Sequence, residues 1–483
     1  MEFPQQKFLP RIGSIRMVVP MLTLQTSAGG QDCEGISRRD CLQIGTLGLG
    51  GLALPGLLQA QAGNLPGFVR DKSIVLLFLG GGPSQVETFN PNMAQPEPYR
   101  SVTGEVKTNV PELRFGGTFP MLAQHADKMV IVKSFHHGQS NHSLAVPYVL
   151  SGGHLFPGGM NTVYARLRGT NHAETGLPTT ALASAPDIGR FANPRKRIIE
   201  GSQPGKLGGA FAPFHPGGGG PAIENMTLNV PHGRLEDRRY LLAALDQLRN
   251  HAEKTGALEE LDQFGQQAYD LVTGGAVDAF DLSKESPKTL ESYDTGMYRV
   301  GEKEGEYRQC SLGHQMLMAR RLVEAGCGFI TVQNSGWDMH ASSGNNFMTL
   351  GQGMEMLGRP LDKAVSAFLS DLSDRGLLEK TLLVITGEFG RTPVINKRGG
   401  RDHWGNLCTL AFAGGGFHTG QVFGESAKKN DVPADKPVNM GNLMATIMNV
   451  LFDVGKLRLE SGMPKELVEP ILNHKPIPLA GVY

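Results

Sequence analysis

Short apolar runs, bounded by glycine and polar residues, recur along the sequence. Runs of this kind are typical of strands that are buried on both faces of a parallel sheet. The predicted strands are Ser73–Leu79, Met129–Phe135, Phe329–Val332, Leu382–Ile385 and Thr409–Ala413. Amphipathic segments separate several of them, with apolar residues at helical spacing. The predicted helices are Leu122–Lys128, Leu235–Leu271, Gln309–Ala325, Leu361–Arg375 and, as the last one, Val438–Val450. This alternation predicts an α/β fold with a mostly parallel sheet.

The alternation is interrupted between residues 154 and 308. Sequence rich in glycine and proline comes first, and the amphipathic segment 235–271 follows it. We therefore expect 154–308 to be an insertion within a single α/β domain that spans residues 63–483. Three histidines of this region, His172, His215 and His232, are expected to be structural or exposed.

The amino-terminal segment has the pattern of an export signal. Arg38 and Arg39 precede the Gly-rich apolar run Ile44–Leu58, and Ala60-Gln61-Ala62 offers a small-residue cleavage site. The run is too short and too interrupted for a spanning helix. Paired arginines before such a run are typical of twin-arginine (Tat) export. We expect residues 1–62 to be removed, leaving a periplasmic or extracellular protein without a transmembrane segment.

The composition excludes some classes of function. The 483 residues carry 46 basic and 46 acidic side chains, so no basic field favours nucleic acid as a partner. The 64 glycines and 30 prolines indicate long ordered loops. Cys310, Cys327 and Cys408 are widely spaced, which supports neither a disulfide framework nor a cysteine-bound zinc site.

Ionisable residues follow three of the predicted strands. They are His136, His137 and His142 after the second strand, Asp338 and His340 after the third, and Glu388, Arg391, Asp402 and His403 after the fourth. Ligands of open α/β sheets lie off the carboxyl ends of the strands, so we expect these side chains to converge at one edge.

Carboxylates and imidazoles together are typical ligands of zinc, manganese or iron. Two neighbouring metal ions would suit an in-line displacement at phosphorus or sulfur, and Arg391 would hold the anion in a bidentate grip. The simpler interpretation is that the Asp–His and Glu–Arg pairs only brace loops.

Four motifs give the chain a family resemblance: GGGPSQVETFNP (Gly80–Pro91), GWDMH (Gly336–His340), GEFGRTP (Gly387–Pro393) and GRDHW (Gly400–Trp404). The chain resembles the exported bacterial DUF1501-type family, a domain of unknown function related to the alkaline phosphatase and sulfatase superfamily. The resemblance covers essentially all of the mature chain. It implies a three-layer α/β/α sandwich of the alkaline-phosphatase and sulfatase type, and it supplies no established substrate.

The superfamily's metal pattern carries over in part. Asp338 and His340 match its late Asp and His, at tighter spacing. Glu388 matches an acid, but Phe389 stands where histidine is expected. The final histidine is matched by His403, with Asp402 beside it, and His142 falls near the position of the nucleophile. Glycines occupy the positions of the early acids, so the resemblance implies one metal ion or a differently built pair.

The sequence thus predicts an exported metal-dependent hydrolase of phosphate or sulfate esters, acting on a small-molecule or polysaccharide substrate. The expected cofactor is a divalent metal ion (zinc, manganese, iron or calcium). The expected metal ligands are Asp338, His340, Glu388, Asp402, His403, His136 and His137, and the expected catalytic residues are His142, itself a possible ligand, and Arg391. The alternative is a catalytically inactive sulfatase-like protein that binds carbohydrate or a surface.

Overall fold

The computed structural model describes residues 66–172, 175–184, 192–215, 276–300, 308–341 and 348–479. The predicted leader, the predicted helix 235–271 and His232 lie outside these ranges. Among the described residues, no helix has both the length and the apolar character needed to cross a membrane.

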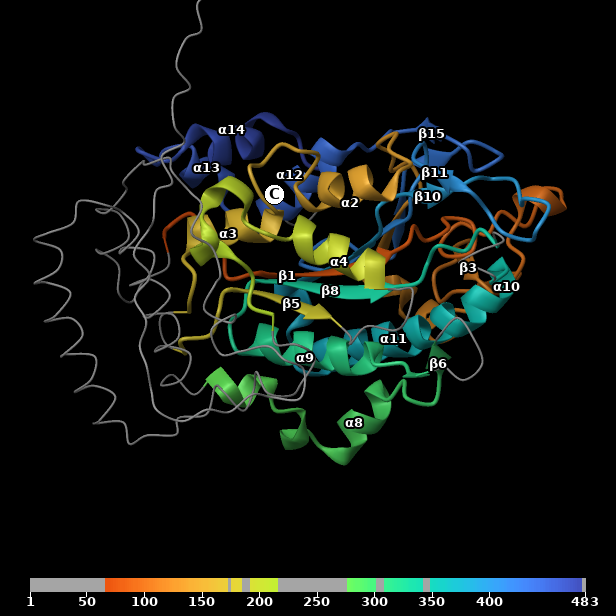
Figure 1. The fold of residues 1–483 in the computed structure, drawn as a ribbon, viewed down its shortest axis with the longest axis horizontal. Coiled ribbons are helices and arrows are strands. Elements are labelled where there is room, and N and C mark those ends of the chain that lie inside the picture. The colour runs from red at the N-terminus through yellow and green to blue at the C-terminus, as the bar shows by residue number, and fades with distance from the viewer. Residues whose placement is uncertain are drawn as a thin grey trace, which may run out of the picture. The chain divides into compact units, whose positions relative to one another are not determined.

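A seven-stranded sheet forms the centre of the fold (Figure 1). In spatial order its strands are β13 (Gln421–Phe423), β4 (Met129–Val132), β12 (Leu410–Gly414), β9 (Thr381–Thr386), β1 (Ser73–Gly80), β8 (Phe329–Ser335) and β5 (Thr180–Ser184). All neighbouring pairs are parallel except those of β12, which is antiparallel to β4 and β9. The predicted α/β fold with a mostly parallel sheet is confirmed, and so are all five predicted strands.

Helices cover both faces of the sheet, so the fold has three layers (Figure 1). One face carries α9 (Leu312–Glu324) and α11 (Arg359–Asp374), with α8 (Pro287–Tyr293) outside them. The other face carries α2 (His142–Leu150), α3 (Met160–Arg168), α4 (Ala192–Gly201) and α12 (Met440–Leu451).

The sequence predicted α12 as the last helix, and this was wrong, because α13 (Val454–Leu457) and α14 (Lys465–Asn473) follow it. α14 contains Pro470, a residue that usually ends a helix, and this obscured its amphipathic pattern.

Short elements complete the described structure. The predicted helix 122–128 is present as the 3-10 helix η3 (Leu122–Lys128), and α10 (Leu350–Gly353) leads through a π-helical turn, Met354–Gly358, into α11. Four two-stranded ladders are formed by β2 (Glu105–Lys107) with β3 (Arg114–Gly116), β6 (Arg299–Val300) with β7 (Arg308–Gln309), β10 (Gly390–Arg391) with β11 (His403–Trp404), and β14 (Glu425–Ser426) with β15 (Pro433–Asp435).

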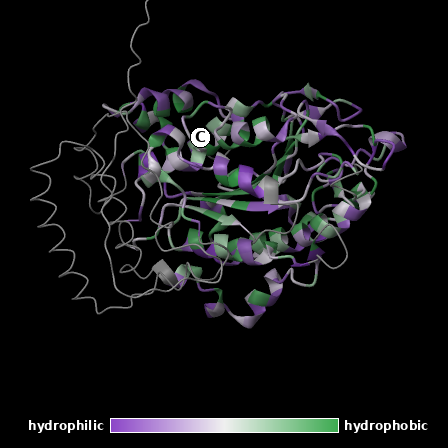
Figure 2. Cartoon of the chain, viewed as in Figure 1, coloured by the Kyte–Doolittle hydropathy of each residue, from purple (hydrophilic) through white to green (hydrophobic). Residues whose placement is uncertain are grey.

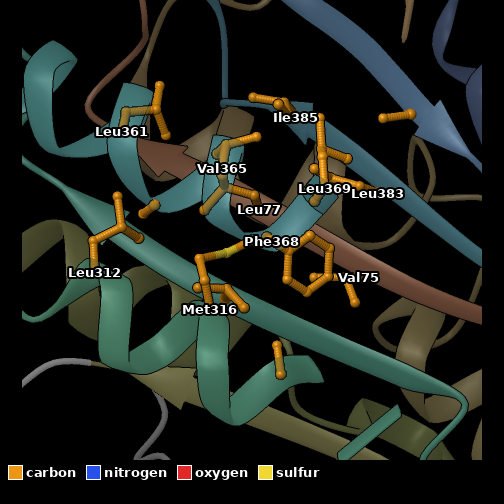
Figure 3. Packing of buried hydrophobic residues seen from close by; sticks show 14 of the residues in the cluster. Val75, Leu77, Leu312, Met316, Leu361, Val365, Phe368, Leu369, Leu383 and Ile385 are labelled. Atoms are coloured by element: carbon orange, nitrogen blue, oxygen red, sulfur yellow. The ribbon is translucent and has the colours of Figure 1, made fainter. Parts of the chain in front are cut away.

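Alternate side chains of the central strand β1 enter two separate cores. Val75 and Leu77 pack with α9 and α11, where Met316 and Phe368 lie over them (Figure 3). The intervening side chains, such as Leu76, join the core beneath α2, α3 and α12. Helices cover both faces of the sheet, so the side chains on each face of β1 must be apolar. This explains why the apolar run is uninterrupted. Green apolar ribbon is accordingly concentrated along the sheet in Figure 2.

The region 154–308 contributes one strand to this sheet. β5 pairs with β8 at the edge, and Phe214 adds hydrogen bonds on its other side through Thr180 and Leu182. The sequence analysis assigned no strand here, because TALAS is short and made mostly of small residues.

Candidate metal centre

The loops that follow β1, β8 and β9 meet at the carboxyl edge of the sheet. The three strands end nearly level, since Gly80 pairs with Ser335 and Phe78 pairs with Thr386. Gly81 then turns with φ of +118°, and a Cβ atom at this position would lie 2.5 Å from the backbone nitrogen of Asp338. Only glycine allows this close approach.

Asp338 lies at the centre of the group formed there. Three imidazole Nε2 atoms surround its carboxylate: His403 at 3.0 Å from Oδ1, and His340 and His142 at 3.3 and 3.4 Å from Oδ2. All four side chains are partly buried. The structure therefore brings together four of the residues that the sequence singled out.

The opposite ring nitrogens fix the orientation of two of these histidines. Nδ1 of His142 lies 2.7 Å from Oε1 of Glu388, and Nδ1 of His403 lies 3.1 Å from the carbonyl oxygen of Ser140. The oxygens at Nδ1 and at Nε2 can all only accept, so a neutral ring donates to one of its two partners. With Nδ1 as the donor, Nε2 presents a lone pair toward Asp338 that a cation can bind.

α2 delivers His142 to this position. The side chain of Asn141 accepts from the backbone nitrogen of Ser143 at 2.9 Å and caps the helix, so His142 is its first residue. Glu388 follows β9 and is 0% exposed. Its two oxygens accept from the backbone nitrogen of Gly81 at 2.8 and 3.0 Å. Glu388, expected as a metal ligand, thus lies behind His142 and supports it.

Arg391 is also turned inward, with its side chain 1% exposed. Nη2 donates to Oδ1 of Asp338 at 2.6 Å, and other donors reach the carbonyl oxygens of Gly82 at 2.7 Å and Arg401 at 3.0 Å. The guanidinium of Arg391, which was expected to bind an anion, instead donates to Asp338 and to backbone carbonyl oxygens.

Phe389 forms a buried wall beside the histidines. Its ring centroid is 4.8 Å from that of His142 and 4.6 Å from that of His403, while those two imidazoles are 4.4 Å apart. A Cβ atom at Gly82 would come within 2.5 Å of the Phe389 ring, so the wall is tightly packed.

A buried ion pair ties the surrounding loops together. Nε of Arg401 lies 3.2 Å from Oε2 of Glu87, and both side chains are fully buried. The backbone nitrogen of Arg401 donates to the carbonyl of Met339 at 3.1 Å. Glu87 lies within the motif Gly80–Pro91, but nothing in the sequence pairs it with Arg401, because 314 positions separate the two residues.

The charges in the group are strongly coupled. Burial alone would lower the pKa of His142, but hydrogen bonds to Asp338 and Glu388 outweigh it and raise this pKa to about 9. Burial would raise the pKa of Asp338, but the three histidines and Arg391 hold it far below its usual range. Burial lowers the pKa of His403. Without a cation, protonated His142 therefore donates from Nδ1 to Glu388 and from Nε2 to Asp338.

This donor set fits a transition-metal ion. Ligand atoms of His142, Asp338 and His403 all lie within 4.8 Å of one another. Ligands bound about 2.0–2.2 Å from a tetrahedral zinc ion lie roughly 3.3–3.6 Å from one another. Nε2 of His403 and of His142 lie 3.0 and 3.4 Å from the oxygens of Asp338, which is close to this spacing. The hydrogen bonds at Nδ1 are the support that metal-binding histidines usually have.

Three other expected ligands lie outside the group. Asp402 is exposed and accepts from Nδ2 of Asn396 at 3.1 Å. The ring of His137 packs against Phe135 and Tyr148, and burial lowers its pKa to about 4. His136 is partly buried, and burial lowers its pKa too. Among the described residues, the group whose ligand atoms lie within 4.8 Å of one another is His142, Asp338 and His403, and it includes none of these three.

The histidines that were expected to be structural have local partners. Nε2 of His215 lies 2.5 Å from Oγ of Ser184, at the end of β5. The ring of His172 packs so closely on Gly326 that a Cβ atom there would lie 2.6 Å from it.

The fold and the site define an α/β/α protein with a histidine–aspartate centre at the carboxyl edge of its sheet. The sequence matches the model of the family described as "Protein of unknown function (DUF1501)" over residues 71–459, so the chain belongs to this family. No curated protein matches the chain significantly.

Several solved structures show a distant similarity. The PsFucS1 sulfatase from Pseudoalteromonas sp. has 10% identity and a TM-score of 0.33, covering 79% of this chain and 68% of its own. The phosphonate monoester hydrolase SpPMH from Silicibacter pomeroyi has 12% identity and a TM-score of 0.32, covering 78% and 72%. The soluble domain of lipooligosaccharide phosphoethanolamine transferase A from Neisseria meningitidis has 8% identity and a TM-score of 0.32, covering 85% and 94%. Similarity at this level is too low to assign a function.

Proposed function

We propose that this protein is an exported, divalent-metal-dependent hydrolase of phosphate or sulfate esters. One observation carries the proposal. The imidazoles of His142 and His403 each have an oxygen that can only accept at both ring nitrogens: Nε2 faces Asp338, and Nδ1 faces Glu388 or the carbonyl of Ser140. A neutral ring donates from only one nitrogen, so when Nδ1 donates, a positive charge is needed between Nε2 and Asp338 across 3.0–3.4 Å.

The candidate ligands are His142, Asp338 and His403, with His340 as a possible fourth. A ligand set rich in imidazole favours zinc, manganese or iron, whereas calcium takes six to eight oxygen ligands. When bound, a divalent cation supplies Lewis acidity, which polarises an ester oxygen and makes a water molecule a better nucleophile.

The chain's own residues prepare the site for this chemistry. Glu388 holds His142 in one tautomer, and Arg391 keeps Asp338 ionised and oriented. Phe389 excludes water from one side, which strengthens every electrostatic interaction in the cleft. The proposed export depends on Arg38 and Arg39 of the predicted leader.

A second candidate is a non-catalytic protein that binds carbohydrate or a surface. The observation that favours it concerns the nucleophile. His142, which stands near the position of the superfamily's nucleophile, is not a serine, threonine or cysteine, and its Nδ1 is held by Glu388. A hydrolase with this site must therefore activate water directly, and a binding protein would need no nucleophile at all.

The test uses purified mature protein, freed of metal and reloaded separately with zinc, manganese or iron. Bound metal is measured by mass spectrometry, and turnover is measured on a panel of aryl phosphates and sulfates. We expect Asp338→Ala and His403→Ala to lose both metal and turnover. His418→Ala, which removes an exposed histidine from the loop before β13, is the matched control and should keep both. Protein that binds no metal would refute the proposal, and metal-loaded protein without turnover would favour the second candidate.

A further inference from the structure

The formal charges of the side chains around the candidate metal ligands sum to a small net charge. The group contains two carboxylates and one guanidinium: Asp338 pairs with Arg391, and Glu388 pairs with His142. Metal-binding histidines are neutral, so this part of the site carries one net negative charge before a cation binds. Glu87 and Arg401 neutralise each other, and Asp402 is exposed and bound to Asn396.

The described residues offer one group of candidate ligands, and no second group lies beside it. The ring of Phe389 fills the space next to His142 and His403 and is itself fully buried. Both oxygens of Glu388 are held by Gly81, one of them also by His142, and the side chain has no exposed surface. Two divalent ions would also leave an excess of three positive charges in a partly buried cleft, which is costly.

The guanidinium of Arg391 is not free to bind a substrate anion. Arg391 forms an ion pair with Asp338, and its donors already serve Asp338 and backbone carbonyls. A substrate anion must therefore be balanced by the cation and the small net charge that remains.

We propose that the centre holds one divalent cation and selects tetrahedral esters that carry a single negative charge, such as sulfate monoesters, phosphate diesters and phosphonate monoesters. This inference rests on the proposed function. One divalent cation gives the site a single net positive charge, which a monoanion neutralises. A dianionic phosphate monoester would leave one negative charge without a partner in the cleft, so it binds less well.

The first experiment compares four substrates with the same leaving group on metal-loaded protein at pH 8. The monoanions are p-nitrophenyl sulfate, bis(p-nitrophenyl) phosphate and p-nitrophenyl phenylphosphonate, and the dianion is p-nitrophenyl phosphate. We expect kcat/KM for at least one monoanion to exceed that of the dianion by about tenfold or more. A preference for the dianion, or two metal ions per chain by mass spectrometry, would overturn the inference while leaving the hydrolase proposal intact.

The second experiment changes the charge without changing the shape. Glu388→Gln keeps an acceptor for Gly81 and His142 and adds one positive charge to the site. With metal occupancy restored by excess cation, we expect the dianion-to-monoanion ratio of kcat/KM to rise by about tenfold. A purely structural role for Glu388 would lower the rates for both substrates and leave the ratio unchanged, which would also count against the inference.

Binding without turnover supplies an independent readout. Calorimetry on metal-loaded protein compares benzenesulfonate, a monoanion, with phenylphosphonate, a dianion at pH 8.5. We expect benzenesulfonate to bind more tightly to the natural protein and phenylphosphonate to gain in Glu388→Gln. If neither substrates nor ligands show any interaction with metal-loaded protein, the proposed function itself fails, an outcome distinct from the reversed preference described above.

Discussion

Nδ1 of His142 lies 2.7 Å from Oε1 of Glu388, and this contact joins the first residue of α2 to the loop that follows β9. Carboxylate support of this kind fixes the tautomer of a metal-binding histidine and makes it a stronger ligand. We expect Glu388→Ala to weaken metal binding by roughly 10–100-fold. Calorimetric titration with zinc measures the change. Glu388→Gln is the matched control, since it retains an acceptor and should lose much less affinity.

Metal binding should depend on pH through His142. In the metal-free protein its pKa is raised to about 9, so at pH 7 the ring is protonated and must lose that proton when a cation binds. Apparent affinity should therefore rise about tenfold per pH unit between pH 6 and pH 8 and level off above about pH 9. Titrations in buffers of different ionisation enthalpy should show about one proton released per cation bound at pH 7. Binding that does not vary with pH would mean that His142 is not a ligand.

Gly81 should be intolerant of any side chain. A Cβ atom there would meet the backbone of Asp338 at 2.5 Å, and backbone atoms cannot move aside cheaply. We expect Gly81→Ala to lower the melting temperature and to abolish metal binding. Gly104→Ala separates steric clash from backbone strain, because Gly104 also has a positive φ of +74° but no atom within 4 Å of a built Cβ. This control should cost about 1 kcal/mol and leave metal binding unchanged.

His137 should contribute to acid sensitivity. Burial lowers its folded-state pKa to about 4, whereas the unfolded chain takes up the proton near pH 6.5. Between these values the unfolded state binds more protons, so stability is present above about pH 6.5 and is lost as pH falls toward 4, by roughly 2–3 kcal/mol. His137→Asn retains an acceptor for the backbone nitrogen of Gln139 but cannot titrate, so its stability should fall less over this range. Urea unfolding at pH 4.5, 5.5 and 7 measures the difference.

The sequence carried enough information to locate the edge of the sheet where the site lies. Strands buried on both faces must be apolar throughout, so β1, β8 and β9 were recognisable, and parallel strands bring their carboxyl ends together. Asp338, His340 and Glu388 could be grouped on that ground alone.

The roles of the individual site residues were harder to predict, because position along a strand does not reveal how deeply a side chain is buried. Asp402 and His403 are neighbours, and His403 is in extended backbone of β11, where successive side chains point to opposite sides. His403 therefore reaches Asp338, while Asp402 faces solvent. Glu388 and Arg391 follow the same strand but are buried behind the candidate ligands, a relationship that depends on the packing of Gly81 and Phe389. Their support of the site could not be distinguished from direct binding by sequence pattern.

The antiparallel placement of β12 has a consequence for how this site can change. The segment 387–409 connects β9 to β12. These two strands are neighbours in the sheet, so both ends of the segment are held side by side. Arg391 pairs with His403 partway along it, so the distal turn lies beyond this ladder and contacts His340 through Asn396. Lys397 and Arg398 at that turn are exposed. The charge of these two residues can therefore change, and with it the field that an approaching anion meets, without disturbing the strands that hold the centre in place.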